Sequence, residues 1–193
     1  MQSRRVSFPL RVDGRELTLE TDHGVFARGH LDSGTAVLLR KAPMPTSGTV
    51  LDLGAGYGPI ALAIAASAPD CVVYAVDVND RALTLVRDNA AANGLRNVHA
   101  CRPDEVPADV VFDVLYSNPP IRVGKATLHD ILRQWLPRLS ATGTAYLVVQ
   151  RHLGADSLHA WLEEEGYRVM RLASSKGYRV LSVAHPDWVG RAR

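Results

Sequence analysis

Short apolar segments alternate with helical patterns from residue 49 onward, and this alternation constrains the fold more than any other feature of the chain. Residues 49–53 and 71–77 are apolar almost throughout, which is typical of strands buried on both faces of a parallel sheet. Strands that alternate with helices predict an open α/β sheet with helices on both faces. The predicted strands are 49–53, 71–77, 97–101, 110–116, 143–150, 167–173 and 178–184.

Helices are expected between these strands. Pro59 fits the first position of one helix, Asp80 can cap the next, and Gly94 suits the left-handed residue that ends it. Two further helices are predicted at 125–139 and 157–165. The last two strands are separated only by residues 174–177, which predicts a hairpin. We therefore predict a seven-stranded, mostly parallel sheet that ends in an antiparallel hairpin.

The first 45 residues follow another pattern. Asp13-Gly14 is a tight-turn signal between the segments 8–12 and 16–20, so we expect a β-hairpin there. Asp32 can cap a short helix, and the prolines at 43 and 45 follow it. We expect residues 1–45 to form an N-terminal extension and residues 46–193 to form the main domain.

The composition is typical of a globular protein, with 193 residues of which 47% are hydrophobic. No apolar run reaches the roughly 18 residues that a membrane-spanning helix requires, and the first residues do not resemble a signal peptide. Cys71 and Cys101 lack the spacing of zinc ligands, and the seven histidines show no paired ligand spacing. We expect reduced thiols, no metal, no membrane association and a cytoplasmic protein.

The basic residues leave two interpretations open. The net charge is only +2, but 19 of the 22 basic residues are arginine, which suits bidentate contacts with phosphate. The second interpretation is that the excess of arginine reflects a compositional bias of the source genome. Charge therefore permits an RNA-binding protein without establishing one.

A glycine-rich turn, residues 52–58, connects the first predicted strand of the main domain to its helix. Gly54 and Gly56 allow the backbone to approach a ligand, and open α/β sheets bind ligands at the carboxyl ends of their strands. In the dinucleotide-binding pattern Gly-x-Gly-x-x-Gly, counted from Gly54, the last glycine would fall on Pro59, so that pattern matches imperfectly.

Two aspartates follow the next two predicted strands. Asp77 can accept hydrogen bonds from both hydroxyls of a ribose, although a loop or capping aspartate would also fit its position. Asp104 lies after the following strand, where it either accepts a hydrogen bond from an adenine amine or belongs to a plain turn. Asp104 and Asp77 lie at the same edge of the predicted sheet, where a nucleoside would bind if both act as ligands.

Asn118-Pro119-Pro120 directly follows the predicted strand 110–116. The prolines end the strand and restrict Asn118 to extended backbone. The amide oxygen of Asn118 and a backbone carbonyl can then point outward together, an arrangement that suits a planar –NH2 group with two donors. Holding both hydrogens aims the nitrogen at an electrophile.

These motifs together resemble class I S-adenosylmethionine-dependent methyltransferases that act on exocyclic or amide nitrogens. The resemblance is closest to the small-subunit ribosomal RNA guanine-N2 methyltransferases, and it covers about residues 20–184. Residues 24–35, 121–125 and 176–180 resemble further segments of that group. The resemblance implies a Rossmann-like fold, S-adenosylmethionine as cofactor, and ribosomal RNA or the small ribosomal subunit as partner.

Site residues follow from the same resemblance. It implies that Asp52, Gly54 and Gly56 cradle the amino-acid part of the cofactor, that Asp77 holds the ribose and that Asp104 lies near the adenine. Asn118 and the Pro119 carbonyl would orient the target amine. Related enzymes often have Tyr or Phe where this chain has Ile121. The residues expected to contact the substrate are Phe26, Arg28, Ile121, Arg122 and Lys125.

The favoured function is methyl transfer to the exocyclic amine of a guanine in small-subunit ribosomal RNA. The same site geometry also serves methylation of adenine, of protein glutamine or of a small molecule. An NAD-dependent oxidoreductase is disfavoured by Pro59, and a non-catalytic nucleotide-binding module leaves Asn118 unexplained. Recognition of the substrate would come from a partner, from a homodimer or from this single domain, and both monomer and homodimer stay open.

Overall fold

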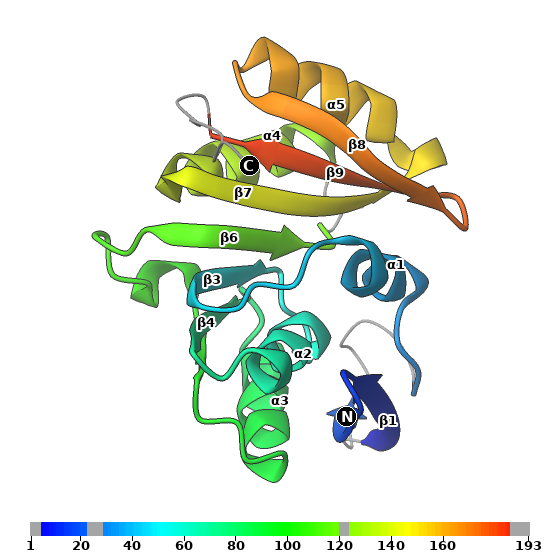
Figure 1. Cartoon of the computed structure of the whole chain (residues 1–193), viewed down its shortest axis with the longest axis vertical. Helices are drawn as coiled ribbons and strands as arrows, with labels where there is room; N and C mark the ends of the chain where they lie inside the picture. The colour runs from blue at the N-terminus through cyan, green and yellow to red at the C-terminus, as the bar shows by residue number, and fades with distance from the viewer. Residues whose placement is uncertain (1–4, 23–28, 120–123, 186–193) are drawn as a thin grey trace.

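The computed structural model describes residues 5–22, 29–119 and 124–185. The strands of its large sheet are β3 (Gly48–Leu53), β4 (Cys71–Val76), β5 (Val98–Cys101), β6 (Phe112–Ser117), β7 (Leu139–Gln150), β8 (Arg168–Ser175) and β9 (Tyr178–Ala184). Their order across the sheet is β5-β4-β3-β6-β7-β9-β8 (Figure 1). The first five are parallel, and β9 lies antiparallel to both β7 and β8. The predicted fold class is therefore confirmed.

Helices pack on both faces of this sheet. The α-helices are α1 (Ser33–Lys41), α2 (Pro59–Ser67), α3 (Asp80–Ala92), α4 (Lys125–Trp135) and α5 (Ala155–Glu164), and the short 3-10 helices are η1 (Pro103–Glu105), η3 (Leu136–Arg138) and η4 (Arg151–Leu153). One apolar core joins α1, α2 and α3 to the sheet, and a second joins α4 and α5 to its other face. Alternate residues of β3 divide between the two cores, with Val50 in the first and Leu51 in the second.

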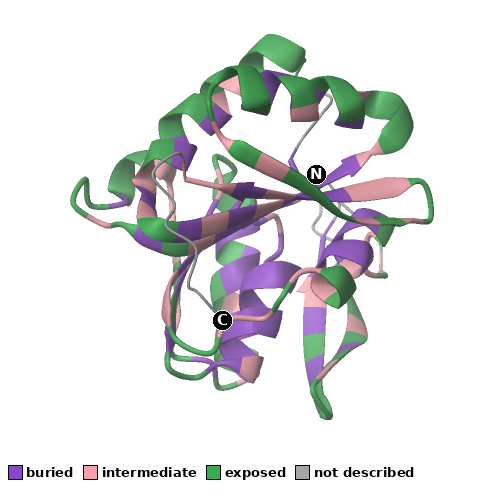
Figure 2. Ribbon diagram, turned by 45° about the horizontal axis from the view of Figure 1, so that its top comes forward, coloured by how far each residue is buried: buried purple, intermediate pink, exposed green. Residues whose placement is uncertain are grey.

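Burial is deepest in the middle of the molecule. Helix α2 is buried from Pro59 to Ala66, as its nearly uniform apolar sequence predicts. Strand β8, by contrast, lies at an edge of the sheet and exposes half or more of its residues (Figure 2). The carboxyl ends of the central strands β3 and β6, unlike this edge, are buried.

The N-terminal hairpin consists of β1 (Val6–Val12) and β2 (Arg15–Thr21), joined by Asp13 and Gly14 with positive φ. Helix α3 binds its free edge through two asparagines. Asn89 accepts the N–H of Glu20 at 2.7 Å and donates to its carbonyl at 2.9 Å, and Asn93 does the same with Thr18 at 3.0 and 2.8 Å. The two side-chain amides thus replace a neighbouring strand. The division of the chain at residue 45 stays a prediction.

Three local expectations were wrong. Asn79, not Asp80, caps α3, because its side chain accepts the N–H of Arg81 at 3.0 Å. Helix α4 ends at Trp135, since Pro137 lacks the N–H that a continuing helix needs, and a 3-10 turn follows. Strand β7 consequently begins at Leu139 instead of residue 143.

Candidate active site

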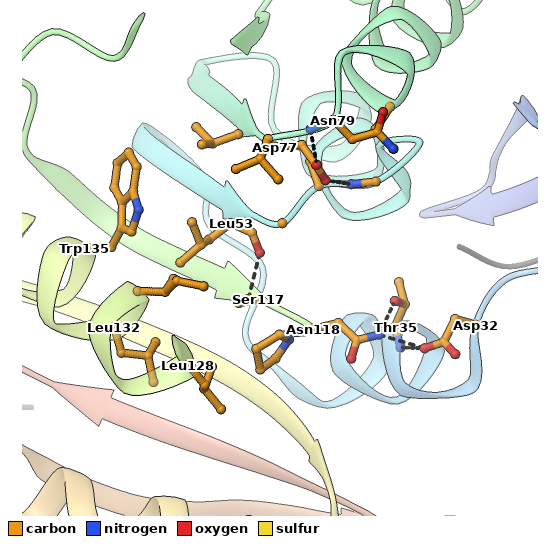
Figure 3. A pocket seen from close by; sticks show the side chains of 18 of the residues that line it. Asp32, Thr35, Leu53, Asp77, Asn79, Ser117, Asn118, Leu128, Leu132 and Trp135 are labelled. Atoms are coloured by element: carbon orange, nitrogen blue, oxygen red, sulfur yellow. Dashed lines mark hydrogen bonds between the residues drawn. The ribbon is translucent and has the colours of Figure 1, made fainter. Parts of the chain in front are cut away.

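A cavity of about 740 Å³ opens at the carboxyl ends of β3, β4 and β6. The glycine loop after β3, the start of α3, the residues after β6, and α4 all contribute to its wall. The hydroxyl of Ser117 donates to the carbonyl of Leu53 at 2.7 Å, which joins the ends of β6 and β3 (Figure 3). The glycine loop and the Asn-Pro turn are therefore fixed next to each other.

The glycine loop crosses the end of β4. The N–H groups of Gly54 and Ala55 both donate to the carbonyl of Val76, at 2.8 and 3.0 Å, and the N–H of Gly58 donates to Ala55. Gly54 and Gly56 have φ of 76° and 57°, which a residue with a side chain rarely adopts. Because these N–H groups already have protein partners, the loop does not offer the row of free donors that a bound pyrophosphate needs.

Asp77 binds the loop from the side of β4. Its Oδ2 accepts the N–H of Gly56 at 2.8 Å, and its Oδ1 accepts the N–H of Asn79 at 2.9 Å (Figure 3). Each carboxylate oxygen has a second lone pair, and Asp77 lines the cavity. The same side chain therefore fixes the loop and keeps acceptor capacity for hydroxyl groups of a ligand.

Asp52 lies beneath the loop, not in the cavity wall. It is entirely buried, and its Oδ2 accepts the N–H of Ala61 in the first turn of α2 at 2.9 Å, whereas its Oδ1 has no partner. Desolvation by burial raises the pKa of Asp52 to about 7, the Ala61 N–H opposes this rise, and the negative charge of Asp77 adds to it. Asp52 therefore exchanges a proton near neutral pH.

Asn118 is held by the start of α1. Its Nδ2 donates to Oδ2 of Asp32 at 2.7 Å and to Oγ1 of Thr35 at 3.1 Å (Figure 3). Asp32 also caps α1, since the same Oδ2 accepts the N–H of Thr35 at 3.0 Å. Both amide hydrogens of Asn118 are thus used on the α1 side, which leaves Oδ1 as the free polar atom of this side chain.

Helix α4 supplies the apolar part of the wall. Leu128, Leu132 and Trp135 line the cavity opposite Asp77 and Asn79 (Figure 3), and Ile131 also lines it. The wall as a whole is mostly apolar with a few polar groups, as in ligand sites that bind a planar ring. These residues were not predicted as site residues, although their spacing at i, i+3, i+4 and i+7 is that of a buried helical face.

The predicted site residues divide into three groups. Gly54, Gly56, Asp77, Asn118 and Pro119 line the cavity together. Asp52, Asp104 and Lys125 do not line it: Asp104 is exposed and lies 3.7 Å from Nε of Arg102, and Lys125 is exposed at the start of α4. The residues Phe26, Arg28, Ile121 and Arg122 lie outside the described part of the chain.

The contacts of Asn118 were not predicted residue by residue. The resemblance implied that residues 26–35 close over the cofactor, but within that segment Asp32 was named only as a helix cap and Thr35 had no role of its own, and Tyr178 was known only as part of the C-terminal hairpin. Local sequence gives no signal that these positions meet Asn118, because the contacts join residues 83 and 86 positions apart.

The described residues contain no metal site, no membrane-spanning helix and no disulfide. Within residues 5–22, 29–119 and 124–185, no group of three His, Cys, Asp or Glu side chains could hold a metal ion. Over the same ranges, no helix has the length and hydropathy needed to cross a membrane. Both cysteines are free thiols, and burial raises the pKa of each.

The fold and the cavity define a class I S-adenosylmethionine-dependent methyltransferase. A family model described as "Methyltransferase small domain" matches residues 16–182. The chain belongs to this family, and within it the chain is close to ribosomal RNA small subunit methyltransferase C.

The relatives support this assignment. An uncharacterized protein of Bacillus subtilis, YbxB, is 34% identical over 94% of this chain and 92% of its own length. Ribosomal RNA small subunit methyltransferase C of Psychromonas ingrahamii is 33% identical over 79% of this chain and 45% of its own length. The solved structure of the T. thermophilus 16S rRNA N2 methyltransferase (RsmC), in complex with AdoMet and guanosine, superposes with a TM-score of 0.79 at 28% identity and covers 93% of this chain. This chain spans about half the length of these two methyltransferases, 45% and 50%.

S-adenosylmethionine is accordingly the cofactor, and the cavity fits it. The apolar wall of α4 and Val76 suits the purine and the methylene groups, and the Asp77 carboxylate suits the ribose hydroxyls. S-adenosylmethionine has no phosphate, which agrees with a glycine loop whose N–H groups at Gly54, Ala55 and Gly56 are already bonded within the protein.

Proposed function

We propose that this methyltransferase transfers a methyl group from S-adenosylmethionine to the exocyclic N2 amine of a guanine in small-subunit ribosomal RNA. The observation that carries the proposal is the orientation of Asn118, whose two amide hydrogens are bound by α1 and whose Oδ1 is left to accept from an –NH2 group. Two of the proteins named above, those of Psychromonas ingrahamii and T. thermophilus, are ribosomal RNA methyltransferases by name, and they support the same substrate class.

The bound cofactor supplies an electrophilic methyl group, which passes to nitrogen as its carbon–sulfur bond breaks and neutral S-adenosylhomocysteine forms. The protein contributes position and charge. Asn118 Oδ1 and the Pro119 carbonyl accept the two hydrogens of the amine, so the nitrogen lone pair points at the methyl group. The same two oxygens stabilise the positive charge that develops on nitrogen, and the extra proton then leaves to water.

The cofactor side of the site divides among the predicted residues. We assign the ribose to Asp77 and the amino-acid part to the loop at Gly54 and Gly56. Asp52 acts on that part only from beneath the loop, where it accepts the N–H of Ala61, because its carboxylate does not reach the cavity wall. Asp104 remains assigned to the neighbourhood of the adenine through Pro103, which precedes it and lines the cavity.

The substrate side is built around Asn118. Tyr178 lines the cavity near Gly34 and supplies an aromatic ring for the target base, which matters because Ile121 replaces the aromatic residue of related enzymes. The target guanine must be unpaired or flipped out of a helix, since its N2 amine is inaccessible within stacked base pairs. The proposed contacts to the RNA are Phe26, Arg28, Ile121, Arg122 and Lys125. We propose that the protein acts in the cytoplasm, as a monomer or as a homodimer.

Transfer of tritium from labelled S-adenosylmethionine tests the proposal. The acceptors are isolated small ribosomal subunits, protein-free ribosomal RNA, total protein and a metabolite extract, each incubated with the wild-type protein and with Asn118→Ala. We expect label in small-subunit RNA that digests to N2-methylguanosine and is absent with the variant. Label that is instead found in N6-methyladenosine, in methylglutamine of a protein or in a small molecule would replace the proposed substrate by that one.

A further inference from the structure

We propose that Asp32 is a positioning residue for methyl transfer, and that it acts by fixing the orientation of the Asn118 side chain. The inference deepens the proposed function and rests on Asn118 as the group that holds the target amine. Asp32 caps α1, and its Oδ2 lies 2.7 Å from Nδ2 of Asn118. This contact joins the N-terminal part of the chain to the turn after β6, 86 positions away.

An asparagine side chain has two nearly isosteric ends, and only one of them suits a target amine. If Nδ2 faced the cavity, its hydrogens would oppose those of the substrate –NH2 group. A carboxylate accepts hydrogen bonds and donates none, so Asp32 selects the orientation in which Nδ2 faces α1. Oδ1 must then face away from Asp32. The Oγ1 of Thr35, 3.1 Å from Nδ2, takes the second amide hydrogen and fixes the plane of the amide.

The negative charge of Asp32 adds to this effect. It lies on the donor side of the amide, where it draws positive charge toward the nitrogen and increases the negative charge on Oδ1. A more negative Oδ1 binds the amine more strongly as positive charge develops on the target nitrogen. Asp32 thereby strengthens an interaction that is greatest in the transition state.

A glycine next to this contact shows that the packing is specific. Gly34 is buried within α1, and its φ lies outside the left-handed range, so helix geometry alone would favour alanine there. A Cβ at this position would lie 2.9 Å from Cε1 of Tyr178, 3.0 Å from Oδ2 of Asp32 and 3.3 Å from Nδ2 of Asn118. The absence of a side chain at Gly34 thus permits Asp32, Asn118 and Tyr178 to meet.

Substitutions at Asp32 separate its two roles. Asp32→Ser keeps an N-cap for α1, because a serine hydroxyl is an equally good cap, but the shorter side chain does not reach Asn118. Asp32→Asn restores an acceptor oxygen of the original length without the charge. Thr35→Val removes the second acceptor and keeps the backbone N–H that the cap uses. In all three variants we expect the affinity for S-adenosylhomocysteine, measured by calorimetry, to stay within about twofold of wild type, since Asp77 and the glycine loop are unchanged.

The first readout does not depend on methyl transfer. The Nδ2 protons of Asn118 are assigned in 15N-labelled protein by their disappearance in Asn118→Ala, and their exchange with solvent is measured. We expect Asp32→Ser to speed this exchange about tenfold or more, because a hydrogen bond that protected the amide is lost, and Asp32→Asn to restore most of the protection. Unchanged exchange in Asp32→Ser would overturn the proposal, whatever the substrate of the enzyme proves to be.

The second readout is the single-turnover rate on the acceptor that the tritium experiment identifies. Asp32→Ser should lower the rate at saturating substrate by about tenfold to a hundredfold, Asp32→Asn should recover to within about fivefold, and Thr35→Val should lose severalfold. If Asp32→Ser changes amide exchange but leaves the rate intact, Asp32 orders Asn118 without a role in catalysis and the proposal fails. Labelling of an acceptor other than ribosomal RNA would refute the proposed substrate alone.

Discussion

The cofactor half and the target half of the site lie side by side, but they are organised over very different distances along the chain. The glycine loop is fixed by Asp77, which is 21 positions from Gly56, and by the end of the neighbouring strand β4. Asn118 is fixed by Asp32, 86 positions away, on a helix that precedes the sheet. The first half is built within one strand–helix–strand unit. The second half exists only once α1 has packed against the sheet.

Because the two halves are fixed by different contacts, we expect them to fail separately. Changes in the glycine loop or at Asp77 should act on cofactor affinity, whereas changes around Asn118 should act on the rate with cofactor bound. Ser117 and Leu53 connect the two halves through one hydrogen bond of 2.7 Å, but no side chain of the Asp32 contact reaches Asp77 in the described structure. Four substitutions test how complete the separation is.

Asn118→Ala should have the largest effect. The variant loses the oxygen that accepts from the target amine, so we expect methyl transfer to fall by about a hundredfold to a thousandfold, as when an oxyanion-hole donor is removed. The affinity for S-adenosylhomocysteine should not change. Calorimetry and single-turnover transfer measure the two quantities. A large loss of cofactor affinity in this variant would show that the two halves are not separate.

Asp77→Ala should act on the other half. It removes two charge-assisted hydrogen bonds to backbone N–H groups, 2.8 and 2.9 Å long, together with the ribose acceptor. We expect the dissociation constant for S-adenosylhomocysteine to rise by about tenfold to a hundredfold. Asp109→Ala is the matched control, because Asp109 is exposed and does not line the cavity. Equal losses in both variants would contradict the role of Asp77.

Gly34→Ala tests the packing of the target half alone, because it changes that half without removing any polar group. Helix propensity favours the change by roughly 0.5–1 kcal/mol, yet the new Cβ would displace Tyr178 or the Asp32–Asn118 contact. We expect the rate to fall about tenfold with cofactor affinity unchanged. Ser33→Ala, one position earlier on the exposed side of α1, is the control and should leave the rate unaltered. A Gly34→Ala variant as active as that control would show that the packing tolerates a methyl group.

Asp52→Asn should have the smallest functional effect and a characteristic pH dependence. Burial raises the folded-state pKa of Asp52 from 3.8 to about 7, so between these values the folded protein binds a proton that the unfolded chain has lost. The contribution of Asp52 to stability therefore falls as the pH rises from about 4 to about 7. Asparagine cannot titrate, so the free energy of unfolding of the variant, relative to wild type, should increase by roughly 2–3 kcal/mol between pH 5 and pH 8. Chemical denaturation at both pH values measures it, and a difference that does not vary with pH would contradict the raised pKa.

Much of the fold was predictable from the sequence. The period of the apolar residues placed the seven strands, and turn residues placed the hairpins at Asp13-Gly14 and before Tyr178. The errors concern element ends, where one hydrogen bond decides: Asn79 rather than Asp80 caps α3, and Pro137 ends α4. The glycine loop, Asp77 and Asn118 were also predictable, because each lies directly after a strand and parallel strands bring such positions to one edge.

The order of elements and the motifs at the strand ends could be read from the sequence, since both depend on interactions between near neighbours. The tertiary structure alone decided that Asp52 is buried beneath the loop, that Asp104 faces solvent, and that Asp32, Gly34 and Tyr178 surround Asn118. Burial depends on how whole elements pack, and the contacts over 80 positions depend on how α1 packs against the sheet, so local sequence patterns do not determine either. The residues of the cofactor half could thus be predicted from the sequence, whereas the orientation of the Asn118 amide, which would hold the substrate, could not.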